Sequence, residues 1–347
     1  MEISESISQP IQDAIEFAIA SKASDVHFKT GQPPAVRING NIVVLELPAL
    51  TDGEIGAFVE YMCPIEKENM NPLEACDFSL VCNGERFRCN VFHDNNGLCV
   101  SMRYLYLPTT DFSVLGIPEI LKKLADRKSG LILITGPTGS GKTTTLTCLI
   151  DYINNTYPLH IIMLEDPIEH VHKSKRSIIS QREIGVNAKT YDSSIVEALR
   201  EDPDIILIGE MRDRDSIQGA LRAAETGHLV LSTLHTKGAA NSISRIIDIF
   251  PPEDQANICM QLSMSLIGVV SQQLVPRADN KGRVLATEVM IANIPVQNLI
   301  RAQKLHMVNS TLDLSSNEGM HTMKRSLEEL LLNDVITRND YDKYQIS

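Results

Sequence analysis

The fold is decided by one stretch, Gly136-Pro137-Thr138-Gly139-Ser140-Gly141-Lys142-Thr143, which matches the pattern G-x-x-x-x-G-K-[ST] at every position. Residues 131–134, just before it, form an apolar run that is typical of a buried strand. Residues 144–153, just after it, carry apolar side chains at helical spacing. A glycine-rich turn without a ligand requires neither the Lys-Thr pair nor these flanks. The stretch therefore predicts a phosphate-binding loop between a strand and a helix.

The residue types in this loop suit a nucleotide. Glycines let backbone N–H groups surround a phosphate, and the following helix adds a favourable dipole. Lys142 can reach the β- and γ-phosphates, and the Thr143 hydroxyl can bind Mg²⁺, so ATP and Mg²⁺ are the predicted cofactors. The residues expected to contact the nucleotide are Gly136, Pro137, Thr138, Gly139, Ser140, Gly141, Lys142, Thr143 and Thr144.

Size, composition and charge restrict the class of protein. The chain has 347 residues, which suits two domains. Its hydrophobic share of 43% is ordinary for a globular protein. It contains 32 Lys and Arg against 44 Asp and Glu, a formal net charge of −12. A general nucleic-acid binder needs a basic surface, so no nucleic-acid partner is expected.

The N-terminus and the cysteines suggest a cytoplasmic protein. Residues 1–5 have neither the basic region nor the apolar core of a signal peptide. No run approaches 18 consecutive apolar residues, so no membrane-spanning segment is expected. None of the seven cysteines forms a C-x-x-C pair, and the spacing of Cys89 and His93 is weak support for a metal site. We expect buried, reduced thiols.

Residues 1–107 are predicted to form a small α+β domain. Apolar positions along 11–21 lie on one helical face. The pair Asn39-Gly40 separates two β-type runs and predicts a hairpin. Thr51 and Glu54 have the spacing of a capping box, which should open a helix that continues to residue 62. The expected strands are 25–28, 35–38, 42–45, 78–81, 86–92 and 98–105.

The remaining chain has a different pattern. Residues 108–118 lack a regular period and contain turn-forming residues, so we place a linker there. Residues 119–347 alternate between helical patterns and short apolar runs, which predicts an α/β domain with a mainly parallel sheet covered by helices. A final helix is expected over 323–335, with its apolar side chains along one side.

Acidic residues follow two of the apolar runs in this second domain. Glu165, Asp166 and Glu169 come after the run 161–164, and Glu210 comes after the run 205–208. In open α/β sheets, ligands bind outside the carboxyl ends of the strands. Each acid alone would be read as a solvated cap. Together with the phosphate-binding loop, they favour a role in holding Mg²⁺ or positioning water.

Two histidines flank a third apolar run. His228 precedes residues 229–232, and His235 follows them within Thr-Leu-His-Thr. A histidine at a strand end can sense a γ-phosphate by hydrogen bonding. Spacing alone favours the simpler interpretation, a structural histidine with satisfied hydrogen bonds.

Taken together, four motifs resemble a known family. They are the loop 136–143, Glu-Asp-Pro-Ile-Glu at 165–169, Asp-Pro-Asp-Ile-Ile-Leu-Ile-Gly-Glu-Met-Arg-Asp at 202–213, and Ala-Glu-Thr-Gly-His with Thr-Leu-His-Thr at 224–236. They resemble the Walker A, Asp box, Walker B and His box of the secretion-type ATPases, which power type II secretion, type IV pili and type IV secretion. Ala-Ser-Asp-Val-His at 23–27 is similar to the N-terminal domain of that family.

Within the family, the chain is most similar to the ATPases that retract type IV pili. It reaches the Ala-Ser-Asp segment almost directly, without the extra N-terminal domain of assembly ATPases, and it lacks their four-cysteine insert. Asn-Leu-Ile-Arg at 298–301 and Gly-Met-His-Thr-Met at 319–323 are similar to the C-terminal motifs of retraction enzymes. Two stretches depart from the family pattern: Pro-Val-Gln at 295–297 replaces Ala-Ile-Arg, and the loop 94–96 lacks an arginine.

The resemblance implies an architecture and a set of acids for catalysis. It implies a hexameric ring whose subunits have a PAS-like N-terminal domain and a RecA-like C-terminal domain, with ATP between the domains and near the neighbouring subunit. Glu169 would be the base that activates water, supported by Glu165 and Asp166. Glu210 would hold Mg²⁺, partly through water, or the lytic water itself.

The resemblance also assigns the histidines and several arginines. His228 and His235 would report the state of the γ-phosphate. Arg88, Arg103 and Arg245 would supply positive charge to the phosphates, and Arg86 is a lesser candidate on the same strand face as Arg88. The alternative for each arginine is a surface ion pair.

The function implied is Mg²⁺-dependent ATP hydrolysis that powers pilus retraction, with hydrolysis changing the angle of the linker. The motor would work at the inner face of the cytoplasmic membrane, bound to a membrane-embedded platform protein, and a paralogous ATPase is a second candidate partner. Three alternatives remain at this point: the same enzyme driving assembly or secretion, a nucleotide-gated accessory subunit with little turnover, and a RecA-like DNA-dependent ATPase. The acidic balance disfavours the last.

Overall fold

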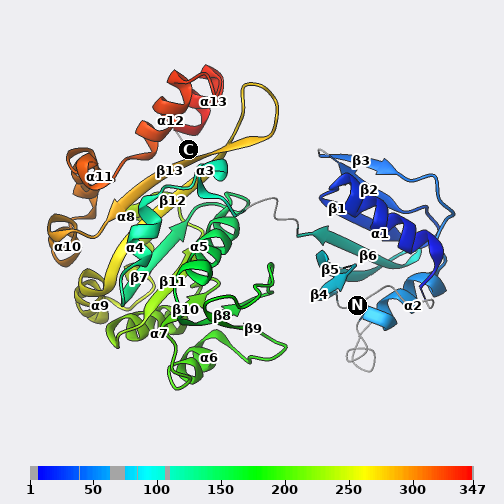
Figure 1. Cartoon of the computed structure of the whole chain (residues 1–347), viewed down its shortest axis with the longest axis horizontal. Coiled ribbons are helices and arrows are strands. Elements are labelled where there is room, and N and C mark those ends of the chain that lie inside the picture. The colour runs from blue at the N-terminus through cyan, green and yellow to red at the C-terminus, as the bar shows by residue number, and fades with distance from the viewer. Residues whose placement is uncertain (1–6, 39, 63–74, 84, 106–109, 346–347) are drawn as a thin grey trace. The chain divides into compact units, whose positions relative to one another are not determined.

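The computed structural model describes residues 7–38, 40–62, 75–83, 85–105 and 110–345. The chain divides into two units, drawn in Figure 1. The first comprises Met1–Pro108 with Pro167–His170, and the second comprises Thr109–Asp166 with Val171–Ser347. The short segment 167–170 is therefore grouped with the first unit although the sequence on both sides of it belongs to the second.

The first unit has a six-stranded sheet in the order β3-β2-β1-β6-β5-β4, and every neighbouring pair is antiparallel. Its elements are α1 (Gln9–Ser21), β1 (Asp25–Lys29), β2 (Ala35–Ile38), β3 (Asn41–Val44), α2 (Asp52–Met62), β4 (Cys76–Cys82), β5 (Glu85–Asp94) and β6 (Gly97–Tyr104). The two helices and the sheet share one hydrophobic core, in which Phe28 and Phe58 pack edge to face. Residue 39 of the predicted hairpin turn lies outside the described residues, but its strands β2 and β3 pair as expected.

The apolar face of α1 and the capping box of α2 explain why these two helices form. Buried side chains of α1 recur at the spacing that keeps them on one helical face, at Ile11, Ala14, Ile15 and Ala18. At α2 the predicted capping box is present: Thr51 N donates to Glu54 Oε2 at 2.8 Å, and Glu54 N donates to Thr51 Oγ1 at 3.2 Å.

The second unit has a seven-stranded sheet in the order β13-β12-β7-β11-β10-β8-β9. All neighbours are parallel except the final pair, β12 and β13. The strands are β7 (Gly130–Thr135), β8 (His160–Glu165), β9 (Ile178–Glu183), β10 (Ile205–Ile208), β11 (Leu229–Leu234), β12 (Leu266–Pro276) and β13 (Arg283–Ile291). The predicted, mainly parallel sheet is thus present.

Helices cover both faces of this sheet. The helices are α3 (Phe112–Leu115), α4 (Ile120–Ala125), α5 (Lys142–Thr156), α6 (Tyr191–Ala198), α7 (Arg214–Glu225), α8 (Ala239–Asp248), α9 (Pro252–Ser265), α10 (Ile294–Arg301), α11 (Val308–Leu314), α12 (Met323–Leu332) and α13 (Arg338–Gln345), with short 3₁₀ turns at Leu305–Met307 and Ser316–Glu318. Successive strand residues alternate between two cores. Leu131 and Leu133 pack with α6 to α11, whereas Ile132 and Ile134 pack with α3 to α5.

Two predicted segments differ in detail. The expected linker 108–118 is not without structure, because Asp111 caps the short helix α3 through Ser113 N at 2.8 Å. The last predicted helix ends at Leu332 rather than at residue 335. Its Leu327 is buried in a small core with Val275 and Ile336, as expected for a docking helix, whereas Leu332 is 81% exposed.

A buried carboxylate ties α12 to the sheet and to α8. Glu288 of β13 is 7% exposed. Its Oε1 accepts from Ala239 N, the first residue of α8, at 2.7 Å, and its Oε2 accepts from Met323 N, the first residue of α12, at 3.3 Å. Ser271, the residue opposite Glu288 on β12, accepts from Gly238 N at 2.9 Å. Helix N-termini favour such negative charge, so one side chain stabilises two helix starts.

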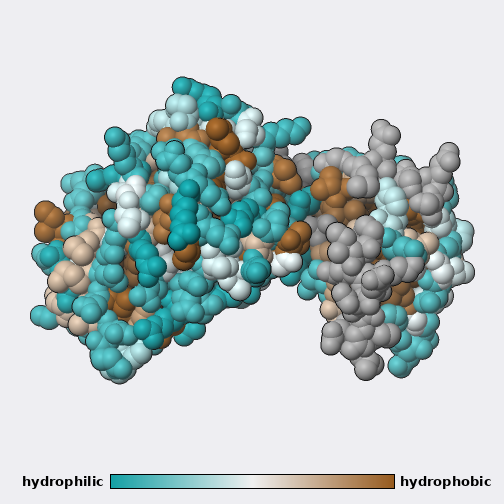
Figure 2. All heavy atoms as spheres, turned by 90° about the horizontal axis from the view of Figure 1, so that it is seen from below, coloured by the Kyte–Doolittle hydropathy of each residue, from teal (hydrophilic) through white to brown (hydrophobic). Residues whose placement is uncertain are grey.

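The cysteines and the surface agree with the composition. Five of the six described cysteines are buried and Cys76 is partly exposed; Cys63 lies outside the described residues. Cys89 is buried and His93 is exposed on the same strand, so these two do not form a shared metal site. Figure 2 shows one face of the protein, which is mostly hydrophilic with smaller hydrophobic areas. No helix in the described ranges has the length and apolar character needed to cross a membrane.

We expect Glu288→Ala to lower the free energy of unfolding by about 2 kcal/mol, because a buried N–H group of Ala239 and a partly buried one of Met323 lose their acceptor. The measurement is urea denaturation followed by circular dichroism. Glu329→Ala is the control, since Glu329 pairs only with Arg325 on the exposed side of α12 and should change stability by about 0.5 kcal/mol or less. Equal effects of the two substitutions would contradict the role given to Glu288.

Candidate active site

The phosphate-binding loop connects β7 to α5 at the carboxyl edge of the sheet. Gly136 opens it with φ 144°, and Gly136 N donates to Leu234 O of β11 at 3.2 Å. A Cβ at this position would lie 2.4 Å from Gln272 O and 2.6 Å from Ser140 Oγ. Only glycine fits, because the backbone of β12 occupies the space that a side chain needs.

Lys142 lies at the centre of the loop. Its Nζ donates to Gly136 O at 2.8 Å and to Pro137 O at 3.1 Å, and the residue is only 8% exposed. Thr143 is exposed and Thr144 is half-buried, both in the first turn of α5. The lysine therefore holds the curvature of the loop and places its positive charge there, while the Thr143 hydroxyl faces solvent.

Polar groups beneath the loop show that it is built to hold an anion. Ser140 Oγ and Thr135 Oγ1 are buried without a hydrogen-bond partner in the described structure. Gln272 Nε2 supports the first turn of α5 by donating to Thr145 Oγ1 at 2.7 Å. Buried polar atoms normally have partners, so the Ser140 hydroxyl is a donor available to a phosphate oxygen. Together with the glycine cradle, these residues fit a nucleotide.

The acids predicted from the two strand ends lie on neighbouring strands. Glu165 is the last residue of β8, and β10 is paired to β8 with Gly209 N donating to Leu164 O at 2.8 Å. Glu210 follows directly. In the described ranges no group of three or more His, Cys, Asp or Glu could hold a metal alone. A Mg²⁺ site here would combine the Thr143 hydroxyl and Glu210 with nucleotide phosphates, which is the usual way proteins bind this ion.

Arg212 lies between two of these acids and was not predicted. It hydrogen bonds to Glu210, and its NH1 lies 3.6 Å from Asp166 Oδ2. The sequence could have indicated Arg212 as a site residue, because it stands two residues after Glu210 in the same motif. Its positive charge balances the carboxylates that meet at this edge.

His235 connects the loop to the acids. Its Nδ1 lies 3.4 Å from Thr138 Oγ1 of the loop, and its Nε2 lies 3.4 Å from Glu210 Oε2. One side chain thus contacts both the phosphate-binding loop and the acid after β10.

His228 lies at the other end of β11 from His235, and its role in reporting the state of the γ-phosphate stays a prediction. It precedes β11, whereas His235 follows it, and a six-residue strand spans about 20 Å. His228 Nδ1 instead lies 3.1 Å from Ala223 O and 3.3 Å from Thr226 Oγ1. Within one chain, His228 therefore lies at the amino ends of the parallel strands, whereas the phosphate-binding loop lies at their carboxyl ends.

Most of the remaining predicted residues belong to the first unit, and Arg245 belongs to the second. In the first unit, Arg88 of β5 is exposed and stands opposite Arg103 of β6, whose Nε donates to Asp25 Oδ1 at 3.1 Å. Arg86 Nε donates to the carbonyl oxygen of Ile168 at 2.6 Å, and Glu169 follows in the same segment. Arg245, in the second unit, is exposed in the last turn of α8. The roles of these residues in catalysis stay predictions.

Sequence reasoning also missed Tyr191, the first residue of α6. A Cβ on Gly209 would lie 3.1 Å from the Tyr191 hydroxyl, so this oxygen stands at the end of β10. Burial, reinforced by the carboxylates of Asp166 and Glu210, raises the pKa of Tyr191. The phenol is therefore neutral near pH 7 and keeps its proton as a hydrogen-bond donor. No local motif marks it, because its position depends on how α6 packs.

Comparisons with known proteins identify the family of the chain. The chain belongs to the family described as Type II/IV secretion system protein, whose family model matches residues 2–338. It is 40% identical over 332 residues to the type IV pilus retraction ATPase PilT of Pseudomonas aeruginosa, covering 95% of this chain and 96% of that one. It is 42% identical over 309 residues to a twitching motility protein of Neisseria gonorrhoeae, covering 87% and 82% of the two chains.

A solved structure extends the likeness to three dimensions. The crystal structure of the pilus retraction motor PilT with bound ADP is 43% identical and has a TM-score of 0.87, with 96% of each chain covered. The family predicted from the four motifs is confirmed. The predicted fold class, a small N-terminal α+β domain followed by a RecA-like P-loop domain, is confirmed as well.

We expect Gly136→Ala to weaken ADP binding by about a hundredfold, because the new methyl group forces the loop away from β12. Gly139→Ala is the matched control in the same loop. Gly139 also has positive φ, at 76°, but nothing lies within 4 Å of its added Cβ. Its effect should be confined to local strain of about 1–2 kcal/mol, roughly a tenfold loss. Titration with a fluorescent ADP analogue measures both, and equal losses would contradict the steric argument.

Proposed function

We propose that this chain hydrolyses ATP with Mg²⁺ and uses the energy to retract type IV pili, as a hexameric motor at the cytoplasmic face of the inner membrane. The observation that carries the catalytic part is the chain of contacts from the loop through Thr138 and His235 to Glu210. These contacts support the proposal, because they bring the phosphate-binding loop, His235 and an acid together at the carboxyl ends of the strands. The likeness to a pilus retraction ATPase and to a twitching motility protein supports the pilus part.

At this site each residue has a physical task. The loop N–H groups and Lys142 hold the β- and γ-phosphates, with the lysine exchanging its two carbonyl acceptors for phosphate oxygens. Thr143 and Glu210 hold Mg²⁺, which when bound neutralises charge on the phosphates. His235 reports whether a γ-phosphate is present, because its two ring nitrogens face the loop and Glu210.

Water is oriented by the acids after β8. Glu169 is the proposed base, and Glu165 and Asp166 support it. Tyr191 adds a neutral donor beside Asp166 and Glu210. His228 is left out of the phosphate contacts made within one chain, since it stands at the other edge of the sheet.

Arg88, Arg103 and Arg245 are proposed to supply positive charge to the phosphates. An arginine that acts in this way contributes about 10³–10⁵ in kcat, whereas an exposed ion pair is worth about 0–1 kcal/mol. Arg103 is bonded to Asp25 in this structure, so its proposed role requires that bond to open.

The proposed partners follow from the function. A ring of six copies would dock on a membrane-embedded platform protein of the pilus machine, and a paralogous ATPase is a second candidate partner. Assembly or secretion driven by the same chemistry is the competing function, because the family description covers both type II and type IV systems.

We expect Lys142→Ala to lower ATP turnover by about a hundredfold or more, because the loop loses its only side-chain cation. Phosphate release under saturating ATP and Mg²⁺ measures it. Lys128→Ala is the control: Lys128 is exposed just before β7, at the opposite edge of the sheet, and its removal should leave turnover unchanged. Full turnover in Lys142→Ala would exclude the proposed site.

The direction of the motor is tested in cells that carry Lys142→Ala. Abundant but static pili would support retraction. Bald cells would show that the motor assembles pili, and unchanged pili would contradict a role in either process.

A further inference from the structure

The side chain of Gln181 joins two points of the chain that lie on either side of the acidic segment. Its Nε2 donates to Glu165 Oε1 at 2.9 Å, and its Oε1 accepts from His172 N at 2.8 Å. The direction of the amide is determined by its partners, because an ionised carboxylate only accepts and a backbone N–H only donates. If the amide were turned over, its oxygen would face the Glu165 carboxylate and its NH₂ group would face the His172 N–H, so both contacts would be repulsive.

The strand that carries Gln181 explains how it reaches Glu165. β9 is the edge strand of the sheet and runs parallel to β8, with Gln181 opposite Met163. Side chains alternate along a strand, so Met163 and Glu165 share a face with Gln181, and the long glutamine spans the diagonal. Isoleucine or valine, common in strands, could fill the same place but could not bridge to the carboxylate.

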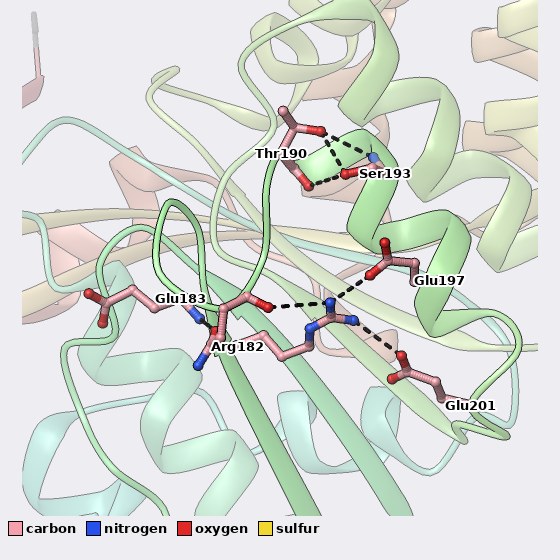
Figure 3. Close-up of polar contacts among 7 residues, drawn as sticks. Arg182, Glu183, Thr190, Ser193, Glu197 and Glu201 are labelled. Atoms are coloured by element: carbon pink, nitrogen blue, oxygen red, sulfur yellow. Dashed lines mark hydrogen bonds and ion pairs between the residues drawn. The ribbon is translucent and has the colours of Figure 1, made fainter. Parts of the chain in front are cut away.

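β9 is itself held from its other face. Arg182 NH2 donates to Glu197 Oε2 at 2.6 Å and Arg182 NH1 donates to Glu201 Oε1 at 3.1 Å (Figure 3). Glu197 lies on α6 and Glu201 follows it. Neighbouring residues on one edge strand therefore anchor it in two directions, Arg182 toward α6 and Gln181 toward β8. An edge strand without such anchors would be free to shift its register.

The segment between the two points bonded by Gln181 is the one that carries the proposed catalytic acids. Residues 166–171 leave β8 after Glu165 and return at His172, and they include Asp166 and Glu169. Gln181 holds both ends of this segment with one amide. Glu165 is 8% exposed, and a carboxylate so buried requires donors to stay in one rotamer.

We propose that Gln181 is a positioning residue that orients Glu165 and closes the base of the 166–171 segment, so that its acids are presented in one geometry for hydrolysis. This inference rests on the proposed function, since it assumes that the acids of this edge act on water. Gln181 itself does not contact the nucleotide, because the phosphate-binding loop follows β7, three strands away from β8 in the sheet.

The discriminating variant is Gln181→Glu. The new carboxylate can still accept from His172 N, but it replaces a donor to Glu165 with a like charge, so the pair holds a proton more tightly. Ionisable groups near this pair include Tyr191, which interacts with Glu165, Glu183, which stands opposite Glu165 on β9, and His172, whose N–H bonds to Gln181; all are retained in the variant. We expect kcat to fall about tenfold to a hundredfold, the acidic limb of its pH profile to move up by about one unit, and KM for ATP to stay within about twofold.

The protein offers a matched control in Gln261. Its Nε2 donates to Glu225 Oε2 at 3.1 Å, between α9 and α7, in an exposed pair away from the acids. Gln261→Glu creates the same pairing of like charges, and we expect kcat, KM and the pH profile to match the wild type. Thermal unfolding of all variants shows whether each chain is folded.

A readout without turnover separates this inference from the proposed function. Titration of carboxyl ¹³C resonances, with Glu165 assigned by Glu165→Gln, should show the pKa of Glu165 about one unit higher in Gln181→Glu than in the wild type. Gln181→Met, which keeps the length but removes both hydrogen bonds, should lower kcat with an unchanged KM.

Two results would overturn the inference: an unshifted Glu165 titration in Gln181→Glu, or wild-type kcat in both Gln181 variants with only thermal stability reduced. A wild-type chain that binds ADP but does not release phosphate would contradict the proposed function instead, and the Glu165 titration would still decide whether Gln181 orients that acid.

Discussion

The contact between Gly136 and the backbone of Gln272 is the constraint on which the second unit depends. A side chain of any size at Gly136 would lie 2.4 Å from a carbonyl oxygen of the neighbouring strand, so the chain must leave β7 at that point and in that direction. The turn aims the loop N–H groups and the N-terminus of α5 at one place, which is what an anion requires. Lys142 then closes the loop from within.

Around this turn, the parallel strands bring chemistry from distant parts of the sequence to one edge. Their carboxyl ends carry the loop after β7, His235 after β11, Glu210 after β10 and Glu165 at the end of β8. Two buried faces make the strands rigid, because alternate residues enter separate cores under different helices. Side chains with several partners then set the finer geometry. His235 and Arg212 each connect groups at the ends of different strands, and Gln181 connects the end of β8 to the backbone of His172.

Features that depend on residues close together in the sequence could be predicted from it. The loop, the capping box at Thr51 and most strand positions follow from short-range patterns, and the structure has them. Contacts that depend on strand order were beyond reach, since Gln181 meets Glu165 only because β9 lies beside β8 in one particular register. Glu288 likewise needs the register of β12 with β13. The separation of His228 from His235 within one chain could be predicted, because residues at opposite ends of a six-residue strand lie about 20 Å apart.

Glu288 has a mechanical consequence. Ala239 and Met323 are far apart in sequence, yet their amides share one carboxylate, so α8 and α12 do not open independently. α8 begins four residues after His235. By reciprocity, any partner that pulls α12 off its acceptor changes the free energy of the segment between His235 and α8, and a change in that segment alters the hold on α12 by the same amount. The Glu288 carboxylate thus couples the two helices mechanically. A force applied to α12 is transmitted to the segment between His235 and α8 without any movement of the sheet between them.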